Sequence, residues 1–253
     1  MWEKRSGFHG FRKNPPHPAV KPLILATLAA LCPVADAQPA APYTTATATP
    51  DGIGKVFHGR EIAKVMGHPA LGWLERDARE SEEAPSKAIA MMALAPDAVI
   101  ADVGTGSGYY AFRISPKIPR GKVMAIDIQP EMLDAVRKRA AELKITNVMP
   151  VLGAIDDLKV EPSSLDAALL VDAYHEFSQP AEMLASMIKS LKPGGKIFLL
   201  EFRGEDAAVP IKALHKMTEA QAKLEFGAAG FRFVESKPGL PWQHFLVFER
   251  PSS

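Results

Sequence analysis

The feature that most constrains the fold is a regular alternation of strand and helix patterns from residue 98 to residue 249. Short apolar runs are typical of buried parallel strands, and the segments between them have the spacing of amphipathic helices. This alternation predicts an α/β fold, with a mainly parallel sheet covered by helices on both faces. We predict strands over 98–103, 122–128, 148–152, 165–171, 196–202, 231–236 and 244–249, and helices over 109–118, 130–143, 181–191 and 219–229.

The last two predicted strands differ from the others because a short loop, and no helix, joins them. Parallel neighbours need a longer crossover connection, so these two strands must run antiparallel to each other. The chain has 253 residues, which suffices for one sizeable domain with additions. The formal net charge of +1 gives no reason to expect a polyanionic partner.

The first 37 residues have the order of features of an export signal. Five basic side chains come first, and residues 22–34 then form an apolar core that is too short to span a bilayer comfortably. Ala35 and Ala37 place small residues where a signal peptidase reads them, which predicts cleavage before Gln38. We therefore expect a signal peptide over 1–37 and a periplasmic or secreted mature chain without stable membrane insertion. The protein would be cytoplasmic if the leader is not used.

Two further segments precede the alternating region. Residues 38–57 begin with a run rich in Ala, Pro and Thr, and we predict a flexible linker there. Residues 58–95 have helical spacing in pieces, and we predict a helical lid over a ligand-binding domain formed by 96–253. The charged run at 76–83 within this lid is expected to be a solvated face or loop.

Three glycines, Gly104, Gly106 and Gly108, follow the first strand of the alternation. A dinucleotide-binding loop needs a third glycine at position 109, where this chain has Tyr109, so a nucleotide-linked oxidoreductase is disfavoured. Asp102 lies two residues before the first glycine, which suits a ligand with a positive end. Asp127 ends the next strand, where a carboxylate can accept hydrogen bonds from both hydroxyls of a ribose. A nucleoside with a cationic amino-acid tail and no phosphate satisfies both observations.

Four segments in this order resemble the class I S-adenosylmethionine-dependent methyltransferases. They are ADVGTGSG, AIDIQPEML, LVDAYHEF and LKPGGKIFLLEF, and the resemblance covers residues 98–249. It implies S-adenosyl-L-methionine as the cofactor. It also implies a Rossmann-like, doubly wound seven-stranded sheet in the order 3-2-1-4-5-7-6, with the last strand antiparallel and an N-terminal helical extension.

The resemblance also implies roles for individual residues. Asp102 would orient the methionine end of the cofactor, the glycines would let backbone approach it, and Asp127 would bind the ribose. The family usually has an acid after the third strand that binds the adenine amino group, and Asp156 is the substitute here because Ala154 and Ile155 occupy the simplest alignment. The predicted cofactor-binding set is Asp102, Gly104, Gly106, Gly108, Asp127, Ile128 against the adenine, Asp156, and Asp172 beside the reacting methyl group.

Polar side chains follow the strands that end beside the predicted cofactor. Ligands of open α/β sheets bind beyond the carboxyl ends of the strands, and a reversed last strand begins at the same edge. We predict Tyr174, His175, Glu201 and His244 as the catalytic candidates, which favours an acceptor with a transferable proton. A metal site built from His175, His215 and His244 is the alternative. We predict no metal, because no close pair of ligands on one helix supports such a site.

The acceptor is expected to be a small molecule, since the motifs most resemble small-molecule methyltransferases, including those acting on quinones. Nucleic-acid substrates are disfavoured because the fourth segment lacks a Pro-Pro-aromatic run, no basic stripe is visible, and the only cysteine, Cys32, lies in the leader. The second hypothesis is an exported, non-catalytic module that binds S-adenosylmethionine or another nucleoside, because this cofactor is made in the cytoplasm. The oligomeric state is left open.

Overall fold

The computed structural model describes residue 10 and residues 43–252 of the chain. The predicted signal peptide, its cleavage site before Gln38 and the first residues of the predicted linker lie outside the described residues. Export therefore stays a prediction.

A seven-stranded sheet forms the centre of the domain, in the order β6-β5-β4-β7-β8-β10-β9. Strands β4 to β8 run parallel to one another, whereas β10 is antiparallel to both β8 and β9. Numbered along the alternating region this order is 3-2-1-4-5-7-6, so the predicted topology is confirmed. The strands are β4 (Val99–Val103), β5 (Lys122–Asp127), β6 (Val148–Leu152), β7 (Leu165–Val171), β8 (Leu191–Phe202), β9 (Arg232–Ser236) and β10 (Gln243–Glu249).

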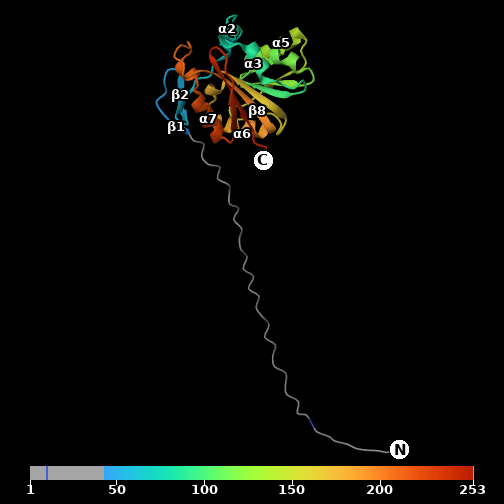
Figure 1. Cartoon of the computed structure of the whole chain (residues 1–253), viewed down its shortest axis with the longest axis vertical. Helices are drawn as coiled ribbons and strands as arrows, with labels where there is room; N and C mark the ends of the chain where they lie inside the picture. Colours follow the sequence, from blue (N-terminus) through green and yellow to red (C-terminus); the bar gives the residue numbers. More distant parts are fainter. Residues whose placement is uncertain (1–9, 11–42, 253) are drawn as a thin grey trace, which may run out of the picture. The chain divides into compact units, whose positions relative to one another are not determined.

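Alternate residues of each strand point to opposite faces of the sheet, so each face carries its own apolar cluster. Ile100 faces α3, α4 and α5, whereas Ala101 beside it faces α6 and α7. The helices are α3 (Pro85–Met92), α4 (Tyr109–Ile114, continued by η2, Ser115–Lys117), α5 (Pro130–Leu143), α6 (Pro180–Ser190) and α7 (Glu219–Ala228). In Figure 1 the labels of α3 and α5 lie above the central sheet and those of α6 and α7 lie below it, in agreement with the two apolar clusters. The predicted coverage of both faces is confirmed.

The linker prediction is wrong for residues 43–45 and 52–57, which form two strands joined by a loop. Strands β1 (Tyr43–Thr45), β2 (Gly52–Phe57) and β3 (Arg60–Ala63) pair into a separate antiparallel sheet. The turn between β2 and β3 consists of His58 and Gly59, both at positive φ (46° and 87°), which is typical of a tight hairpin. The Tyr43 hydroxyl donates a hydrogen bond of 2.6 Å to Glu182 on α6 and so attaches the small sheet to the main domain.

The lid is helical over most of its length but differs from the prediction at both its start and its charged run. Its first residues belong to β3, and the helical part comprises η1 (His68–Ala70), α1 (Leu71–Leu74), α2 (Arg79–Glu83) and α3. The charged run is not solvated throughout, because Arg79 is 5% exposed and Glu83 is 1% exposed. Arg79 Nε donates to Glu83 Oε2 at 2.7 Å, so the two charges enter the interior as an ion pair.

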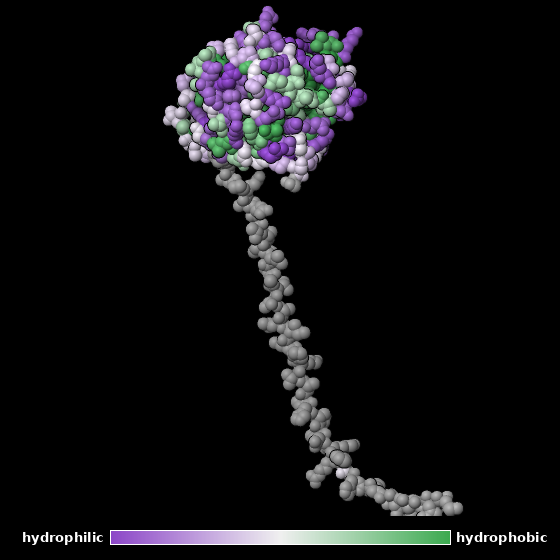
Figure 2. Space-filling model, viewed as in Figure 1, coloured by the Kyte–Doolittle hydropathy of each residue, from purple (hydrophilic) through white to green (hydrophobic). Residues whose placement is uncertain are grey.

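On the face shown in Figure 2, hydrophilic residues cover much of the described surface, and hydrophobic residues appear in small patches between them. Among residues 43–252, we find no helix with the length and apolar character needed to cross a bilayer.

Candidate active site

A cavity of about 620 Å³ lies at the carboxyl ends of the parallel strands, under the lid. This is the edge at which open α/β sheets bind their ligands. The loop after β4 and the end of β5 form one wall, and the segments after β7 and β8 form another. Ile53 of β2 lines the cavity, and so do the lid residues Ala63, Val65, Met66, Trp73, Leu74, Arg76, Arg79 and Glu83.

The glycine loop forms part of the cavity wall. Gly104, Gly106 and Gly108 all have positive φ (75°, 53° and 77°), a conformation that side chains with a Cβ rarely adopt. Gly104 and Gly106 line the cavity. Gly108 caps the start of α4 instead, and a Cβ there would lie 2.7 Å from Phe112 Cε2. Gly104 and Gly106 are therefore placed where backbone could approach a ligand, which stays a prediction, whereas Gly108 allows the helix to pack.

Asp102 lies behind this loop and holds its shape. Its Oδ2 accepts hydrogen bonds from Thr105 Oγ1 (2.8 Å) and from the Ala111 backbone N–H (3.2 Å). Burial raises the pKa of Asp102 to about 6. The side chain is not among the residues that line the cavity, so its direct contact with a ligand stays a prediction.

Asp127 and Ile128 line the cavity beside the glycine loop, as predicted. The Asp127 carboxylate accepts hydrogen bonds from the backbone N–H groups of Gly106 (3.0 Å) and Gln129 (2.9 Å). Burial raises the pKa of Asp127. Each carboxylate oxygen has two lone pairs, so acceptor capacity remains for the hydroxyls of a ribose. Ile128 is 40% exposed, which leaves an apolar surface available to a flat ring.

The position of Asp156 does not support the prediction that this residue binds the adenine amino group. Asp156 is exposed and lies outside the cavity, whereas Ala154 and Ile155 line it. Backbone pairing explains this arrangement, because Ala154 N–H donates to the Asp157 carbonyl (2.8 Å) and closes a tight turn after β6. The wall here is apolar where the family usually has an acid.

Asp172 lines the cavity at the end of β7 and has an unusual backbone, with φ of 48°. Gln243 Nε2 donates to its Oδ2 at 2.6 Å. Its Oδ1 is buried and has no hydrogen-bond partner among the described residues. Burial raises the pKa of Asp172 well above its usual value, and repulsion from Glu83 and Glu201 raises it further. A cationic group beside Oδ1 would satisfy this atom and favour its ionised form.

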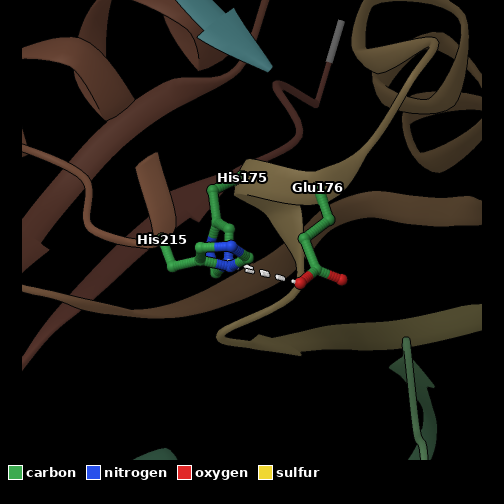
Figure 3. A group of neighbouring side chains, drawn as sticks. All are labelled: His175, Glu176 and His215. Carbon is green, nitrogen blue, oxygen red and sulfur yellow. Dashed lines mark hydrogen bonds and ion pairs between the residues drawn. The ribbon is translucent and has the colours of Figure 1, made fainter. Parts of the chain in front are cut away.

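His175, Glu176 and His215 converge on the same cavity (Figure 3). His175 and Glu176 belong to η3 (Tyr174–Glu176), and His215 ends η4 (Ala213–His215). His175 Nε2 lies 3.1 Å from His215 Nδ1, and Glu176 Oε1 lies 3.3 Å from the same His215 nitrogen. On its other side, His175 Nδ1 is 2.6 Å from Glu201 Oε2. Burial alone would lower the pKa of His175, but the Glu201 carboxylate outweighs it, and the pKa is raised.

Of the four catalytic candidates, only His175 lines the cavity, and the other three do not. Tyr174 is fully buried against Phe177 and Phe226, because the tight η3 turn points it into the core and His175 toward the cavity. His244 pairs with Glu205 at 2.7 Å outside the cavity. Side chains alternate along β10, so Gln243 faces Asp172 and His244 points away. Glu201 is buried behind His175, where it accepts hydrogen bonds from the His175 ring and backbone N–H, and it contributes to the raised pKa of Asp172.

Several residues that line the cavity are absent from the predicted site. Glu176 is one of them, and the sequence predicts His215 only as a ligand of the alternative metal site with His175 and His244. No local pattern joins Glu176 to His215, because they come from two short turns far apart in the chain. Arg79 and Glu83 were assigned to solvent, although their spacing of four residues is that of a helical ion pair. Arg79 also stacks over Tyr109, with its Cζ 4.3 Å from the ring centroid, and so brings the lid into contact with α4.

Comparisons with known proteins agree with this arrangement. Residues 100–195 match the family described as methyltransferase domain. A demethylmenaquinone methyltransferase from Deinococcus radiodurans is 32% identical over 103 residues, covering 41% of this chain and 42% of that protein. An uncharacterized methyltransferase-like protein from Schizosaccharomyces pombe is 28% identical, covering 56% of this chain and 52% of the other. The chain thus spans about half the length of the curated relatives that it matches.

Solved structures show the same fold. The crystal structure of a SAM-dependent methyltransferase from Aquifex aeolicus aligns with a TM-score of 0.68 and 20% identity, covering 73% of this chain and 99% of the other. The [4+2]-cyclase SpnF aligns with a TM-score of 0.59 and 16% identity, covering 67% of this chain and 80% of that one. Similarity at this level describes the fold alone.

Proposed function

We propose that this chain is a class I S-adenosylmethionine-dependent methyltransferase. It binds S-adenosylmethionine and transfers the cofactor's methyl group to a small, largely apolar acceptor. The observation that carries the proposal is that one cavity joins the glycine loop to a polar wall formed by the segments after β7 and β8. A cofactor and an acceptor can therefore lie in contact within one cavity. Positioning of the two reactants supplies much of the rate enhancement in such a displacement.

The residues on the glycine-loop side fit the cofactor. Asp127 has acceptor capacity for the ribose hydroxyls, and Ile128 and Ile155 offer apolar surface to the adenine. The unpartnered Oδ1 of Asp172 suits the positively charged part of the molecule. A Cβ at Gly104 would lie 2.7 Å from Ala173 Cβ, so a side chain there would narrow the passage between the two walls. Bound S-adenosylmethionine supplies an electrophilic methyl group on a sulfonium.

The opposite side of the cavity suits an acceptor with an apolar body and one ionisable group. Ile53, Val65 and Trp73 from the N-terminal segment line the cavity, and each is at least 40% exposed, which gives the cavity an apolar rim. The acceptor atom forms a bond to the methyl carbon as the carbon–sulfur bond breaks and its electron pair passes to sulfur. The acceptor's proton passes to water at the exposed rim of the cavity before or during this step. Relatives named for demethylmenaquinone and for ubiquinone/menaquinone biosynthesis support an apolar acceptor.

Release of S-adenosylhomocysteine tests the proposal. The purified protein is incubated with methyl-labelled S-adenosylmethionine and fractions of an organic extract, and both labelled product and S-adenosylhomocysteine are quantified. We expect both to form in the same fraction in equal amounts, and to fall in Asp127→Asn. Tight cofactor binding without product in any fraction would refute turnover and favour the non-catalytic module.

A further inference from the structure

We propose that His175, Glu176 and His215 bind a divalent transition-metal ion of the Zn²⁺ type at the polar end of the cavity. We further infer that this ion holds the ionisable group of the methyl acceptor; this second statement rests on the proposed function. The sequence predicts no metal site, because no two candidate metal ligands lie close together on one helix. The ligands come instead from two short turns, η3 and η4, which the fold brings together.

The spacing of the three ligand atoms fits a single ion. Ligands about 2.1 Å from a metal at tetrahedral angles lie about 3.4 Å from one another. His175 Nε2 and His215 Nδ1 are 3.1 Å apart, His215 Nδ1 and Glu176 Oε1 are 3.3 Å apart, and His175 Nε2 and Glu176 Oε1 are 3.8 Å apart. In Figure 3 the Glu176 carboxylate points toward both imidazole rings. Small rotations of these side chains therefore suffice to place an ion between them.

Hydrogen bonding alone leaves this group of atoms incompletely satisfied. A neutral His175 donates its Nδ1 hydrogen to Glu201, so its Nε2 presents a lone pair. Glu176 Oε1 also presents a lone pair. The single hydrogen on His215 Nδ1 can be donated either to His175 Nε2 or to Glu176 Oε1, but not to both. A cation at the centre would satisfy all three atoms at once.

The surrounding contacts hold two of the three ligands, His175 and Glu176, as metal sites require. A histidine that binds a metal typically donates its other ring N–H to a carboxylate, as His175 does to the buried Glu201. The Met66 backbone N–H donates to Glu176 Oε2 at 3.0 Å, which leaves Oε1 for the ion. Arg60 donates to the His175 carbonyl at 3.1 Å and is itself held by two contacts with Glu225 (2.8 and 2.9 Å). The site is thus preorganised from three directions.

The donor set selects the kind of metal and its role. Two imidazoles and one carboxylate suit Zn²⁺ and its neighbours, whereas Mg²⁺ and Ca²⁺ prefer oxygen ligands. Three protein ligands leave a coordination position open, as in catalytic sites. All three ligands line the cavity that also contains Asp172, so the open position can take an acceptor oxygen or sulfur. Coordination lowers the pKa of such a group and assists loss of its proton.

Metal binding is tested on the full chain without a polyhistidine tag. The protein is stripped with a chelator and titrated with Zn²⁺ and, separately, Mg²⁺, and the visible absorption spectrum of the Co²⁺-loaded protein reports coordination. We expect one Zn²⁺ per chain that Mg²⁺ does not displace. His215→Ala and Glu176→Gln should bind Zn²⁺ more than about 100-fold more weakly, and Glu201→Gln about 10- to 100-fold more weakly. His244→Ala is the matched control, because it removes a histidine paired with a glutamate outside the site.

Several outcomes would overturn the inference. Equal Zn²⁺ affinity in the parent, His215→Ala and Glu176→Gln, with all variants folded by circular dichroism, rules out this site. Calorimetric titration with S-adenosylmethionine keeps the two proposals separate, because cofactor affinity should stay within about threefold in all variants. Zn²⁺ binding without any methyl transfer would refute the proposed function and leave the metal site standing. Equal turnover by stripped and Zn²⁺-loaded protein would refute the role of the ion in holding the acceptor.

Discussion

Replacing Asp127 by Asn should weaken S-adenosylmethionine binding without unfolding the domain. The charged carboxylate has acceptor capacity on the cavity side, and hydrogen bonds to a charged group contribute about 1.5–3 kcal/mol. The dissociation constant should therefore rise about 10- to 150-fold. Asparagine keeps one acceptor oxygen, so one of the two backbone N–H groups from Gly106 and Gln129 loses its partner. This loss should lower the free energy of unfolding by about 1–3 kcal/mol.

Two measurements separate these effects. Isothermal titration gives the affinity for S-adenosylmethionine and for S-adenosylhomocysteine, and urea unfolding of the free protein gives its stability. Both ligands carry the same ribose, so both should weaken by the same factor. Asp156→Asn is the matched control, because Asp156 is exposed outside the cavity and should change neither quantity. An unchanged affinity in Asp127→Asn, or a loss confined to S-adenosylmethionine, would refute the ribose assignment.

Three further predictions follow from the buried groups around the cavity. Gly106→Val should abolish cofactor binding while the circular dichroism spectrum stays native, because the new Cβ would lie in the cavity wall, 2.5 Å from the end of the Leu74 side chain. Retained binding would mean that the loop does not contact the ligand. Arg79→Met should lower the free energy of unfolding, measured with urea, by about 3 kcal/mol, because Glu83 stays buried with only Arg76 beside it. Arg137→Met breaks an exposed ion pair instead and should lower the free energy of unfolding by under about 1 kcal/mol. Asp102 has a folded-state pKa raised from 3.8 to about 6, so its contribution to stability is present below pH 3.8 and is lost as the pH rises through 6. The unfolding free energy of Asp102→Asn relative to the parent should therefore rise by about 3 kcal/mol between pH 3.5 and pH 7, and a constant difference would contradict the raised pKa.

The sequence by itself determined the sheet and the glycine-loop side of the cavity. Strand and helix periodicities are local patterns, and contiguous motifs place Gly104, Gly106 and Asp127 at the ends of adjacent strands. The parallel topology then leaves those strand ends at one edge, so their proximity follows without knowledge of side-chain contacts. The same local reasoning failed for residues 43–45 and 52–57, where strand formation depends on a hairpin turn and on attachment to α6.

Only the tertiary structure decided the polar wall and the lid. Within one short turn Tyr174 points into the core and His175 into the cavity, and the direction of each depends on what packs around the turn. His215 reaches His175 from a residue 40 positions away, across loops that have no periodic pattern. Arg79 and Glu83 carry the charges of surface residues but are buried because they neutralise each other beneath the lid. Contacts of this kind depend on long-range packing, which a local pattern does not encode.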